Sequence, residues 1–309
     1  MKINIVDVGA RYGIHPNFLD LKDIANFFLF EIDKEECQRL KKKYNKNKNI
    51  KIFNQGIFSK KTILDFYIRN HNALNSLYNI NKFFFKENHY KKKEFEKKKI
   101  INIKVDSLDS FFKKKIHILK LDVEGAELEV LKGAKNQLEK NCIGIRSEVT
   151  FSPVYKNAPL FSEINDFLLK KNFELINFDY TGKGSKYGKY AYNSKYGKLI
   201  TTDAIWLKKN FDFKKKNIDK LFQISTFLFL NNSSDLAIDY MLKYVDINKE
   251  SFKKYLSIPT VKFLKRKILI LFKNLLSVPN FKEKIIYNDY KKLFGEEFPK
   301  LHKFYQKNI

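Results

Sequence analysis

Residues 116–125, IHILKLDVEG, give the strongest signal of a buried strand in the chain and end in acids and a glycine. A run of this kind is typical of a strand that is buried on both faces of a parallel sheet. It leads directly into residues 126–140, where the apolar spacing predicts an amphipathic helix. A buried strand followed at once by such a helix is the building unit of α/β sheets. The residues that share the apolar helix face are Leu128, Leu131, Ala134 and Leu138.

The alternation of apolar strands and helices extends over about residues 3–208 and predicts a doubly wound, mostly parallel α/β sheet. Two further helices are expected at residues 33–44 and 160–171. The other predicted strands are residues 3–8, 26–33, 50–58, 62–69, 100–105, 142–149, 173–180 and 201–207.

The pattern changes after residue 210, where helical periodicity dominates. We therefore expect two units, a sheet domain over residues 1–210 and a helical extension or cap over residues 211–309. One helix of the second unit, Pro259–Ser277, is both basic and apolar. It either packs against the sheet, which we favour because amphipathic helices commonly cover sheets, or lies on a membrane surface.

The formal net charge is +27, from 61 Lys and Arg against 34 Asp and Glu, which by itself suggests a polyanionic partner. Only five of the cationic residues are Arg, the better reader of phosphates. Lys is enriched together with Asn, Ile and Phe, which share A/T-rich codons. A coding bias explains this set, so nucleic acid is not the expected partner.

Cys37 and Cys142 lie far apart and no CxxC pair occurs, so neither a disulfide framework nor a zinc site is indicated. Asp7 interrupts the only N-terminal apolar run that could serve as a signal segment. No later run approaches the roughly 18 apolar residues that cross a membrane. These features favour a cytoplasmic protein.

The turn after the first strand has the pattern D-x-G-x-x-x-G, from Asp7 to Gly13. In an open α/β sheet this turn lies where ligands bind, beyond the carboxyl ends of the strands. It lacks the G-x-G-x-x-G of dinucleotide sites and the Gly-Lys-Ser/Thr of phosphate loops. A nucleoside ligand without a phosphate chain remains, and S-adenosylmethionine is such a ligand.

A second acid, Glu31, ends the next strand and can accept hydrogen bonds from both ribose hydroxyls. Gly9 and Gly13 let the backbone approach a ligand closely, and Asp7 places negative charge near the ammonium group of the methionine moiety. The predicted cofactor-binding residues are Asp7, Gly9, Ala10, Gly13, Glu31, Ile32 and Gly56.

Residues 119–134, LKLDVEGAELEVLKGA, closely resemble the FkbM family of class I S-adenosylmethionine-dependent methyltransferases. The resemblance covers about residues 3–208, because further segments follow in the family's order: DVGARYG, FEIDKEECQRL, NALNSLYN, VDSLDSFF and SEVTFSPVYKNAPLFSEINDFLLKKNFEL. It implies a seven-stranded sheet, S-adenosylmethionine as cofactor and methyl transfer to a hydroxyl, often of a sugar or glycan intermediate. Arg11 and Tyr12 depart from the family's usual turn, and the C-terminal hundred residues lie outside the resemblance.

Charged residues alternate at the end of the central strand, as Lys120, Asp122 and Glu124. If the strand continues through them, all three project to one side near its carboxyl end. Charges on a buried strand must be paired or contact a ligand. We predict Asp122 as the base or as the group that orients the acceptor, with Glu124 beside it and Lys120 paired with them. Glu148 ends the next strand and is expected to face the same cleft.

A divalent metal held by Asp122, Glu124 and Glu148 is conceivable, because hard cations prefer oxygen ligands. No His is spaced to join them, so we expect no metal. The nearby Glu127 is expected only to begin the following helix, where acids favour the N-terminal dipole.

Polar residues in NHNALNSLY, after the third strand, are expected to line the acceptor side of the cleft. The predicted substrate-binding residues are Asn72, Ser76 and Tyr155. His71 is a secondary candidate for a base, although a lone His in a polar loop is more often solvated. The loop with the repeat SKYGK, at Ser185 and Ser194, either contacts an acidic sugar through its Tyr and Lys residues or is a solvated turn.

Three functions remain in competition. We favour an O-methyltransferase that acts on a hydroxyl of a sugar, a glycan or a related small molecule. The net charge supports an RNA methyltransferase instead, but SPVY at residues 152–155 has one proline and the wrong position for the Pro-Pro-Tyr motif of amino-group methyltransferases. A non-catalytic protein that docks to membranes through its basic tail is disfavoured, because acids are retained at Glu31, Asp122 and Glu148.

Overall fold

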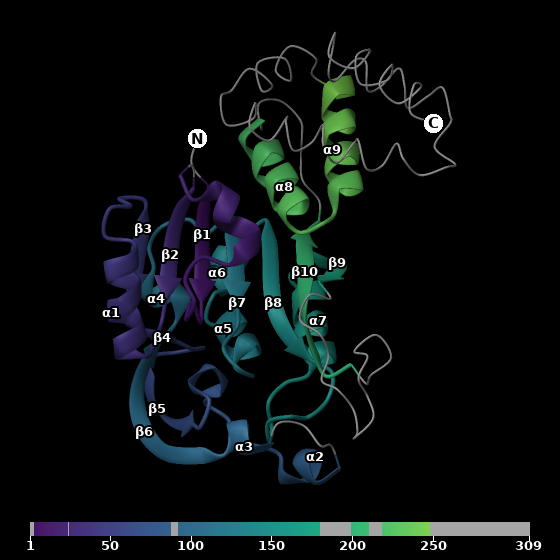
Figure 1. Cartoon of the computed structure of the whole chain (residues 1–309). Coiled ribbons are helices and arrows are strands. Elements are labelled where there is room, and N and C mark those ends of the chain that lie inside the picture. The colour runs from purple at the N-terminus through teal and green to yellow at the C-terminus, as the bar shows by residue number, and fades with distance from the viewer. Residues whose placement is uncertain (1–2, 24, 88–91, 180–198, 210–217, 248–309) are drawn as a thin grey trace, which may run out of the picture. The chain divides into compact units, whose positions relative to one another are not determined.

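The computed structural model describes residues 3–23, 25–87, 92–179, 199–209 and 218–247 (Figure 1). The chain divides into two compact units, residues 1–211 and 212–309. The first unit contains two β-sheets, and the second contains two of the described helices.

The larger sheet is built from β1 (Asn4–Val8), β2 (Asn26–Phe30), β3 (Ile50–Phe53), β7 (Ile118–Leu121), β8 (Gly144–Thr150), β9 (Phe173–Asp179) and β10 (Thr201–Lys208). These seven strands lie in the order β3-β2-β1-β7-β8-β10-β9. Every neighbouring pair is parallel except the two pairs that β10 forms with β8 and β9. The predicted doubly wound, mostly parallel sheet is therefore confirmed.

A second sheet has three strands, β4 (Gly56–Ile57), β5 (Thr62–Arg69) and β6 (Lys97–Asp106), in the order β4-β6-β5. In Figure 1 it lies beyond the lower ends of β1 and β2. The predicted strand at residues 50–58 is therefore divided between the two sheets. The break falls at Asn54, whose side-chain amide donates to the carbonyls of Glu31 and Ile32 at 3.0 and 2.9 Å.

The helices of the first unit connect the strands. α1 begins after Asp33, whose side chain accepts the N–H groups of Glu35 and Glu36. It ends in three lysines, as the helix dipole favours. The helices are the 3₁₀ helices η1 (Pro16–Leu21) and η2 (Asn72–Leu74), and α1 (Lys34–Lys43), α2 (Lys82–Glu87), α3 (Lys92–Phe95), α4 (Leu108–Phe111), α5 (Glu127–Lys132), α6 (Lys135–Lys140) and α7 (Phe161–Leu169).

The single helix predicted over residues 126–140 is wrong, because the structure contains α5 and α6 with Gly133 between them. A Cβ atom at Gly133 would lie 2.1 Å from the carbonyl oxygen of Phe58, so only glycine permits this close approach. Asp109 fixes the start of α6 by accepting the N–H groups of Asn136 and Gln137 at 2.8 and 3.2 Å. The helix is interrupted at Gly133, where the backbone of Phe58 occupies the space that a side chain would need.

The two faces of the larger sheet carry different side chains. Val6 and Val8 of β1 face a cluster of buried apolar residues that includes side chains of α4, α5, α6 and α7. Asp7, between them, faces the opposite way, because successive strand residues alternate between the faces. In the sheet register Asp7 lies next to Lys120, and Lys120 lies next to Arg146. Three buried charged residues therefore form a row across β1, β7 and β8.

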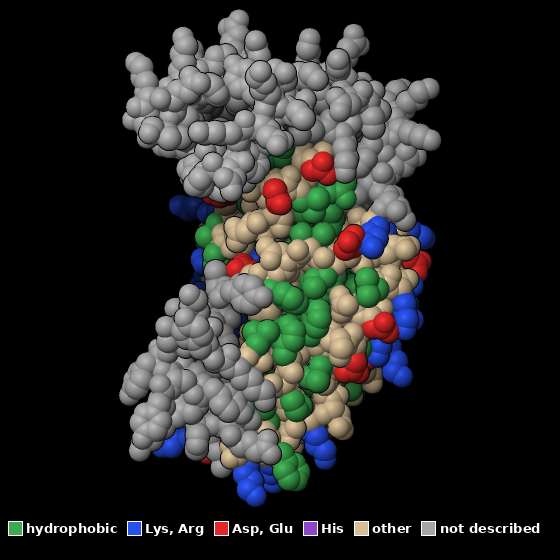
Figure 2. All heavy atoms as spheres, turned by 90° about the vertical axis from the view of Figure 1, so that its right-hand side faces the viewer, with side chains coloured by type: hydrophobic (Ala, Val, Ile, Leu, Met, Phe, Trp, Pro, Cys, Tyr) green, Lys and Arg blue, Asp and Glu red, His purple; other side chains and the backbone are tan. Residues whose placement is uncertain are grey.

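Strand β9 forms one edge of the larger sheet, next to α7. Leu175, Ile176 and Phe178 of this strand are only partly buried. Figure 2 shows this side of the molecule, where hydrophobic side chains gather in a band with acidic and basic side chains along its margin. The edge is thus apolar at its centre and charged around it.

In the second unit the structure describes α8 (Ile218–Leu230) and α9 (Ser234–Ile247), which pack against each other. Both lie where the sequence shows helical periodicity after residue 210. The predicted helix at Pro259–Ser277 and the SKYGK repeats at Ser185 and Ser194 lie outside the described residues. Among the helices that the structure describes, none is long and apolar enough to cross a bilayer.

Candidate active site

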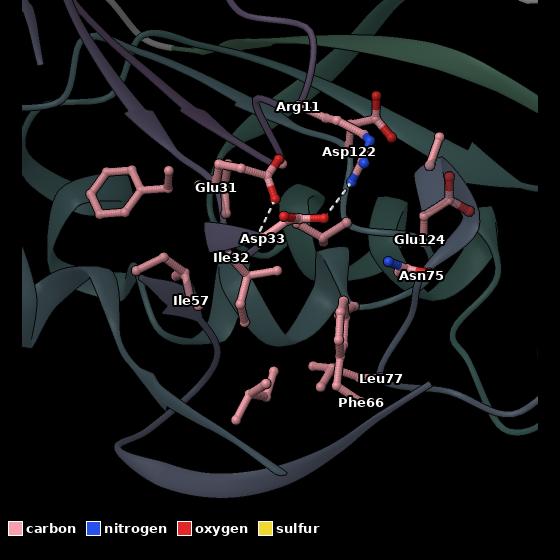
Figure 3. Close-up of a pocket in the computed structure, with 18 of the residues that line it drawn as sticks. Arg11, Glu31, Ile32, Asp33, Ile57, Phe66, Asn75, Leu77, Asp122 and Glu124 are labelled. Carbon is pink, nitrogen blue, oxygen red and sulfur yellow. Dashed lines mark hydrogen bonds and ion pairs between the residues drawn. The ribbon is translucent and has the colours of Figure 1, made fainter. Parts of the chain in front are cut away.

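A cavity of about 230 Å³ lies beyond the carboxyl ends of β1, β2, β7 and β8 (Figure 3). The strand order reverses here, because β2 and β3 lie on one side of β1 and β7 lies on the other. The predicted site residues that line the cavity are Gly9, Glu31, Ile32, Gly56, Asn72, Asp122, Glu124 and Glu148. The structure also describes six predicted site residues that do not line it: Asp7, Ala10, Gly13, Lys120, Ser76 and Tyr155.

The small sheet supplies an apolar wall to this cavity. Phe66 of β5 and Ile103 and Val105 of β6 line it, together with Leu77. In Figure 3, Phe66 and Leu77 lie on the side of the cavity away from Asp122. The sequence did not indicate this wall, because strand propensity alone does not show which strands leave the main sheet.

Gly9 connects the first turn to the end of β7. It adopts a φ of +85°, in the backbone region that favours glycine. Its N–H and that of Ala10 both donate to the carbonyl of Phe30 at 3.0 Å, which closes the turn against the end of β2. A Cβ atom on Gly9 would lie 1.8 Å from the carbonyl oxygen of Asp122, so the two backbones touch with no space for a side chain.

Arg11, in the first turn, pairs with the acids at the start of α1. Its guanidinium contacts the carboxylates of Asp33 at 3.3 Å and Glu36 at 3.9 Å, at the N-terminus of α1. Arg39 of α1 donates back to the Arg11 carbonyl at 2.9 Å. The turn is therefore tied to α1 by charge, and both Arg11 and Asp33 line the cavity (Figure 3).

Glu31 follows β2 and lines the cavity, although only 5% of the residue is exposed. Its Oε1 accepts the N–H of Asp33 at 2.8 Å. Burial raises the pKa of Glu31 to about 7, against the opposing effects of that hydrogen bond and of the Arg11 charge. A buried carboxylate on a cavity wall is stabilised by a ligand that donates hydrogen bonds, as a ribose diol does.

Asp7 is 2% exposed and lies behind the cavity wall. Lys120, which is also buried, contacts the carboxylate of Asp7 at 3.2 Å and that of Asp122 at 3.3 Å. Burial lowers the pKa of Lys120, but the two carboxylates outweigh burial and the net pKa is raised. Lys120 therefore stays charged, compensates Asp7 and holds Asp122 at the end of β7. A contact between Asp7 and the ammonium group of the cofactor stays a prediction.

Asp122, Glu124 and Glu148 form a carboxylate cluster in which one oxygen of each lies within 4.8 Å of the others. Burial, and then the charge of Asp122, raises the pKa of Glu124 to about 8. Burial and Glu124 raise the pKa of Glu148 well above its usual value. Glu124 therefore exchanges a proton near neutral pH, in the range that suits a general base, and Glu148 keeps its proton more readily than an ordinary carboxyl group. The expectation that no metal binds here stays a prediction, since oxygen ligands also suit hard cations.

Glu124 does not continue the strand. β7 ends at Leu121 and Glu124 has a φ of +54°, so the predicted alternation of three charges along one strand is wrong. Glu127 fixes the turn instead, because its Oε1 accepts the N–H groups of Val123 at 2.9 Å and of Gly125 at 3.3 Å. Glu127 thus does more than begin α5, since it shapes the turn that carries Glu124.

Ser76 and Tyr155, which we predicted to bind substrate, are buried beside Glu124. The Ser76 hydroxyl donates to the Glu124 carbonyl and the Tyr155 hydroxyl donates to the Glu124 carboxylate, both at 2.6 Å. Asn72 lines the cavity, as does its neighbour Asn75, whereas His71 does not. Contacts of Ser76 and Tyr155 with a substrate stay predictions.

Two charged residues beside the cluster, Asp203 and Arg146, were missed from the sequence. Asp203 of β10 lies directly opposite Glu148 in the antiparallel pair of β8 and β10. Nη2 of Arg146 lies 2.6 Å from the carboxylates of both Asp179 and Asp203. Opposite charges within the apolar segments CIGIRSEV and TTDAIWL were the available signal, because charges on buried strands need partners.

Three of the solved structures that resemble this one are described by their sequence identity and by the share of each chain that is covered. An FkbM methyltransferase from Methylobacillus flagellatus KT is 14% identical with a TM-score of 0.40, over 67% of this chain and only 43% of that protein. An rRNA methylase from Streptococcus thermophilus is 9% identical with a TM-score of 0.33, over 68% of this chain and 88% of that protein. TrmK from M. capricolum, solved with S-adenosylhomocysteine, is 11% identical with a TM-score of 0.33, over 88% of this chain and 91% of that protein. No curated protein matches the chain.

The family assignment rests on a stronger finding. A family model described as the methyltransferase FkbM domain matches residues 7–175, which is more than half of the chain. All the residues that line the cavity, from Val8 to Glu148, fall within this match. The chain therefore belongs to the FkbM methyltransferase family.

Proposed function

We propose that the protein transfers a methyl group from S-adenosylmethionine to a hydroxyl of a sugar, a glycan or a related small molecule. The observation that carries this proposal is that one cavity combines two kinds of acid. Glu31 lies at the end of β2, the position from which an acid accepts ribose hydroxyls. The cluster of Asp122, Glu124 and Glu148 supplies carboxylates that can receive the proton of an acceptor.

S-adenosylmethionine, when bound, supplies a methyl group attached to a positively charged sulfur. Glu31 is the residue to accept the ribose hydroxyls, and Gly9 lets the backbone of the first turn lie against the ligand. Ile32 and Ile57 add apolar surface to the same cavity.

Methyl transfer to a hydroxyl depends first on holding the acceptor in line with the methyl group. Asn72 and Asn75 line the cavity and can both donate to and accept from sugar hydroxyls. The Asp122 side chain is 42% exposed and is held by Lys120, so its carboxylate is open to an acceptor. A base that removes the hydroxyl proton as the new bond forms contributes about 10²- to 10⁴-fold in rate.

RNA is the second candidate acceptor, because the net charge of +27 favours a polyanion. The charged residues that line the cavity argue the other way. A phosphate close to the reacting group would lie beside several carboxylates, and like charges repel. We therefore place RNA behind a sugar or glycan hydroxyl. The charged lining residues are Glu31, Asp33, Asp122, Glu124 and Glu148 against Arg11.

The test is transfer of labelled methyl from S-adenosylmethionine to three pools of acceptor: sugar nucleotides, lipid-linked glycans and total RNA. We expect label in one of the first two pools and, after hydrolysis, in an O-methylated sugar. Glu31→Ala is the control. It lacks the carboxylate that accepts hydrogen bonds from the ribose hydroxyls, so it should transfer no labelled methyl to any pool. Label in RNA alone would replace the proposal by the second candidate, and no label in any pool would reject it.

Cofactor affinity should depend on pH through Glu31. Its pKa is raised to about 7 in the folded protein, and ribose hydroxyls stabilise the ionised form by donating hydrogen bonds. Because protonation competes with binding, affinity should be full above about pH 8 and fall about tenfold per unit below about pH 7. Calorimetric titrations over this range measure the slope. Glu31→Gln should bind S-adenosylmethionine more weakly, and its affinity should not change with pH over this range. A wild-type affinity that does not change with pH would contradict the role of Glu31.

A further inference from the structure

Glu124 lines the cavity in a backbone conformation that disfavours a residue with a side chain. Its φ of +54° lies in the left-handed region. Such a conformation persists only where the surrounding contacts enforce it. The contacts around Glu124 therefore identify the residues that hold it in place.

Tyr155 makes the contact to the Glu124 carboxylate. It is 3% exposed, and its hydroxyl donates to Oε2 of Glu124 at 2.6 Å. Burial, together with the neighbouring Glu124, raises the pKa of Tyr155 well above its usual value, so the phenol keeps its proton. A short hydrogen bond from a phenol to a carboxylate is among the strong ones in proteins.

Arg69 of β5 holds the Tyr155 ring. Its guanidinium lies 5.5 Å from the ring centroid and is fully buried. Nη1 and Nη2 donate to the carbonyls of Phe95 and Tyr78 at 2.9 and 2.6 Å, which fixes the cation in place. The ring therefore rests on a cation that has little freedom to move.

The backbone of the turn is fixed from the same side. The Ser76 hydroxyl donates to the Glu124 carbonyl at 2.6 Å. Gly125, with a φ of +100°, brings the turn so close to Tyr155 that a Cβ atom there would lie 3.2 Å from the ring. Ser76 thus holds the backbone of Glu124, Tyr155 holds its carboxylate, and Arg69 holds Tyr155.

We propose that Tyr155 is a positioning residue that holds the Glu124 carboxylate in the cavity, with Arg69 holding Tyr155. The proposal rests on the proposed function, in which Glu124 belongs to the cluster that receives the proton of the acceptor. The bond to Oε2 leaves Oε1 for that purpose, because a carboxylate has two accepting oxygens. The charged groups that face Glu124 are Asp122, Glu127, Glu148 and Arg69.

Tyr155→Phe removes the hydroxyl and keeps the ring next to Arg69. Tyr67→Phe is the matched control. The centroid of the Tyr67 ring lies 5.8 Å from the Arg69 guanidinium, but the hydroxyl that donates to the Glu124 carboxylate belongs to Tyr155. Kinetics on the acceptor found in the three pools should show kcat lowered about 10²-fold in Tyr155→Phe. The control should keep its kcat, and KM for S-adenosylmethionine should be unchanged in both.

The pH profile separates a positioning role from a structural one. The hydrogen bond from Tyr155 lowers the pKa of Glu124, so its loss should move the ascending limb of the kcat profile to higher pH by at least about one unit. In a Glu124→Gln background, Tyr155→Phe should have little further effect, because the group it positions is gone. The proposal would be overturned if Tyr155→Phe kept the wild-type kcat and pH profile. It would also be overturned if Tyr155→Phe lowered kcat as much in the Glu124→Gln background as in the wild-type protein, or if Tyr155→Phe no longer folded.

Crystal structures of the wild-type protein and of Tyr155→Phe separate this inference from the proposed function, because they need no acceptor. We expect the Glu124 carboxylate to face the cavity in the wild-type protein and to turn away from it in Tyr155→Phe. An unchanged Glu124 in that variant would reject the positioning role whether or not methyl transfer to a hydroxyl is found. Absence of any transfer by the wild-type protein would instead reject the proposed function.

Discussion

Asp122→Asn should lower kcat by about 10²- to 10⁴-fold and leave the affinity for S-adenosylmethionine unchanged. Asparagine keeps the shape of the side chain and removes one of the charges of the carboxylate cluster that receives the proton of the acceptor. The fold should survive, because Lys120 keeps its contact with Asp7 at 3.2 Å. Steady-state kinetics on the identified acceptor measures the first effect, and calorimetric titration of the cofactor measures the second.

Asp166→Asn on α7 is the matched control for this substitution. Asp166 is exposed, is paired with Lys170 at 2.7 Å and does not line the cavity. The same change of charge should there leave kcat as it is in the wild-type protein. Wild-type turnover in Asp122→Asn would remove Asp122 from the mechanism and leave Glu124 or Glu148 as the base.

Gly9→Ala should lower the free energy of unfolding by about 3 kcal/mol or more, and the protein that still folds should bind no cofactor. The added Cβ has to displace the Asp122 carbonyl oxygen, which lies 1.8 Å from its position, and the φ of +85° adds backbone strain. Urea unfolding measures the loss of stability. Titration of the folded protein with S-adenosylmethionine measures binding.

Gly133→Ala provides the control for the loss of binding. Its Cβ would lie 2.1 Å from the Phe58 carbonyl oxygen, so this position is crowded as well, but Gly133 does not line the cavity. The variant should lose stability and keep its affinity for the cofactor. A wild-type affinity in Gly9→Ala would mean that the first turn tolerates a side chain and does not touch the ligand closely.

The main sheet could be predicted because strands buried on both faces are unusually apolar. All four residues of β7 are buried, and the acids that follow mark where it stops. The second sheet could not be predicted in the same way. The first six residues of β6 are exposed, and its sequence resembles that of any surface strand. Only the pairing of β5 and β6 with each other separates them from the main sheet.

The place of the acids was predictable, but their partners were not. Glu31, Asp122 and Glu148 line the cavity, because the carboxyl ends of parallel strands meet at one edge of the sheet. Asp7 belongs to the first strand in the same way, yet Lys120 neutralises it behind the wall. That contact depends on the register between two strands, which neither strand encodes alone.

The support for Glu124 was hidden for a related reason. Tyr155 and Arg69 lie far apart in the sequence, and they meet only in the folded chain, where Arg69 at the end of β5 lies against the Tyr155 ring. Local patterns report which residues favour a strand or a turn, and they carry no information on such a meeting. A partial signal existed, because Arg69 closes an apolar strand and a buried guanidinium needs partners.

The cavity has one wall from each sheet, and each sheet has its own ladder of hydrogen bonds. Substitutions at Phe66 or Ile103 therefore reshape the apolar wall without disturbing the strands that position Asp122 and Glu31. The shape of the apolar wall and the position of the acids are thus carried by different strands, so the cavity can be reshaped through β5 and β6 while the carboxylates at the ends of β2 and β7 stay in place.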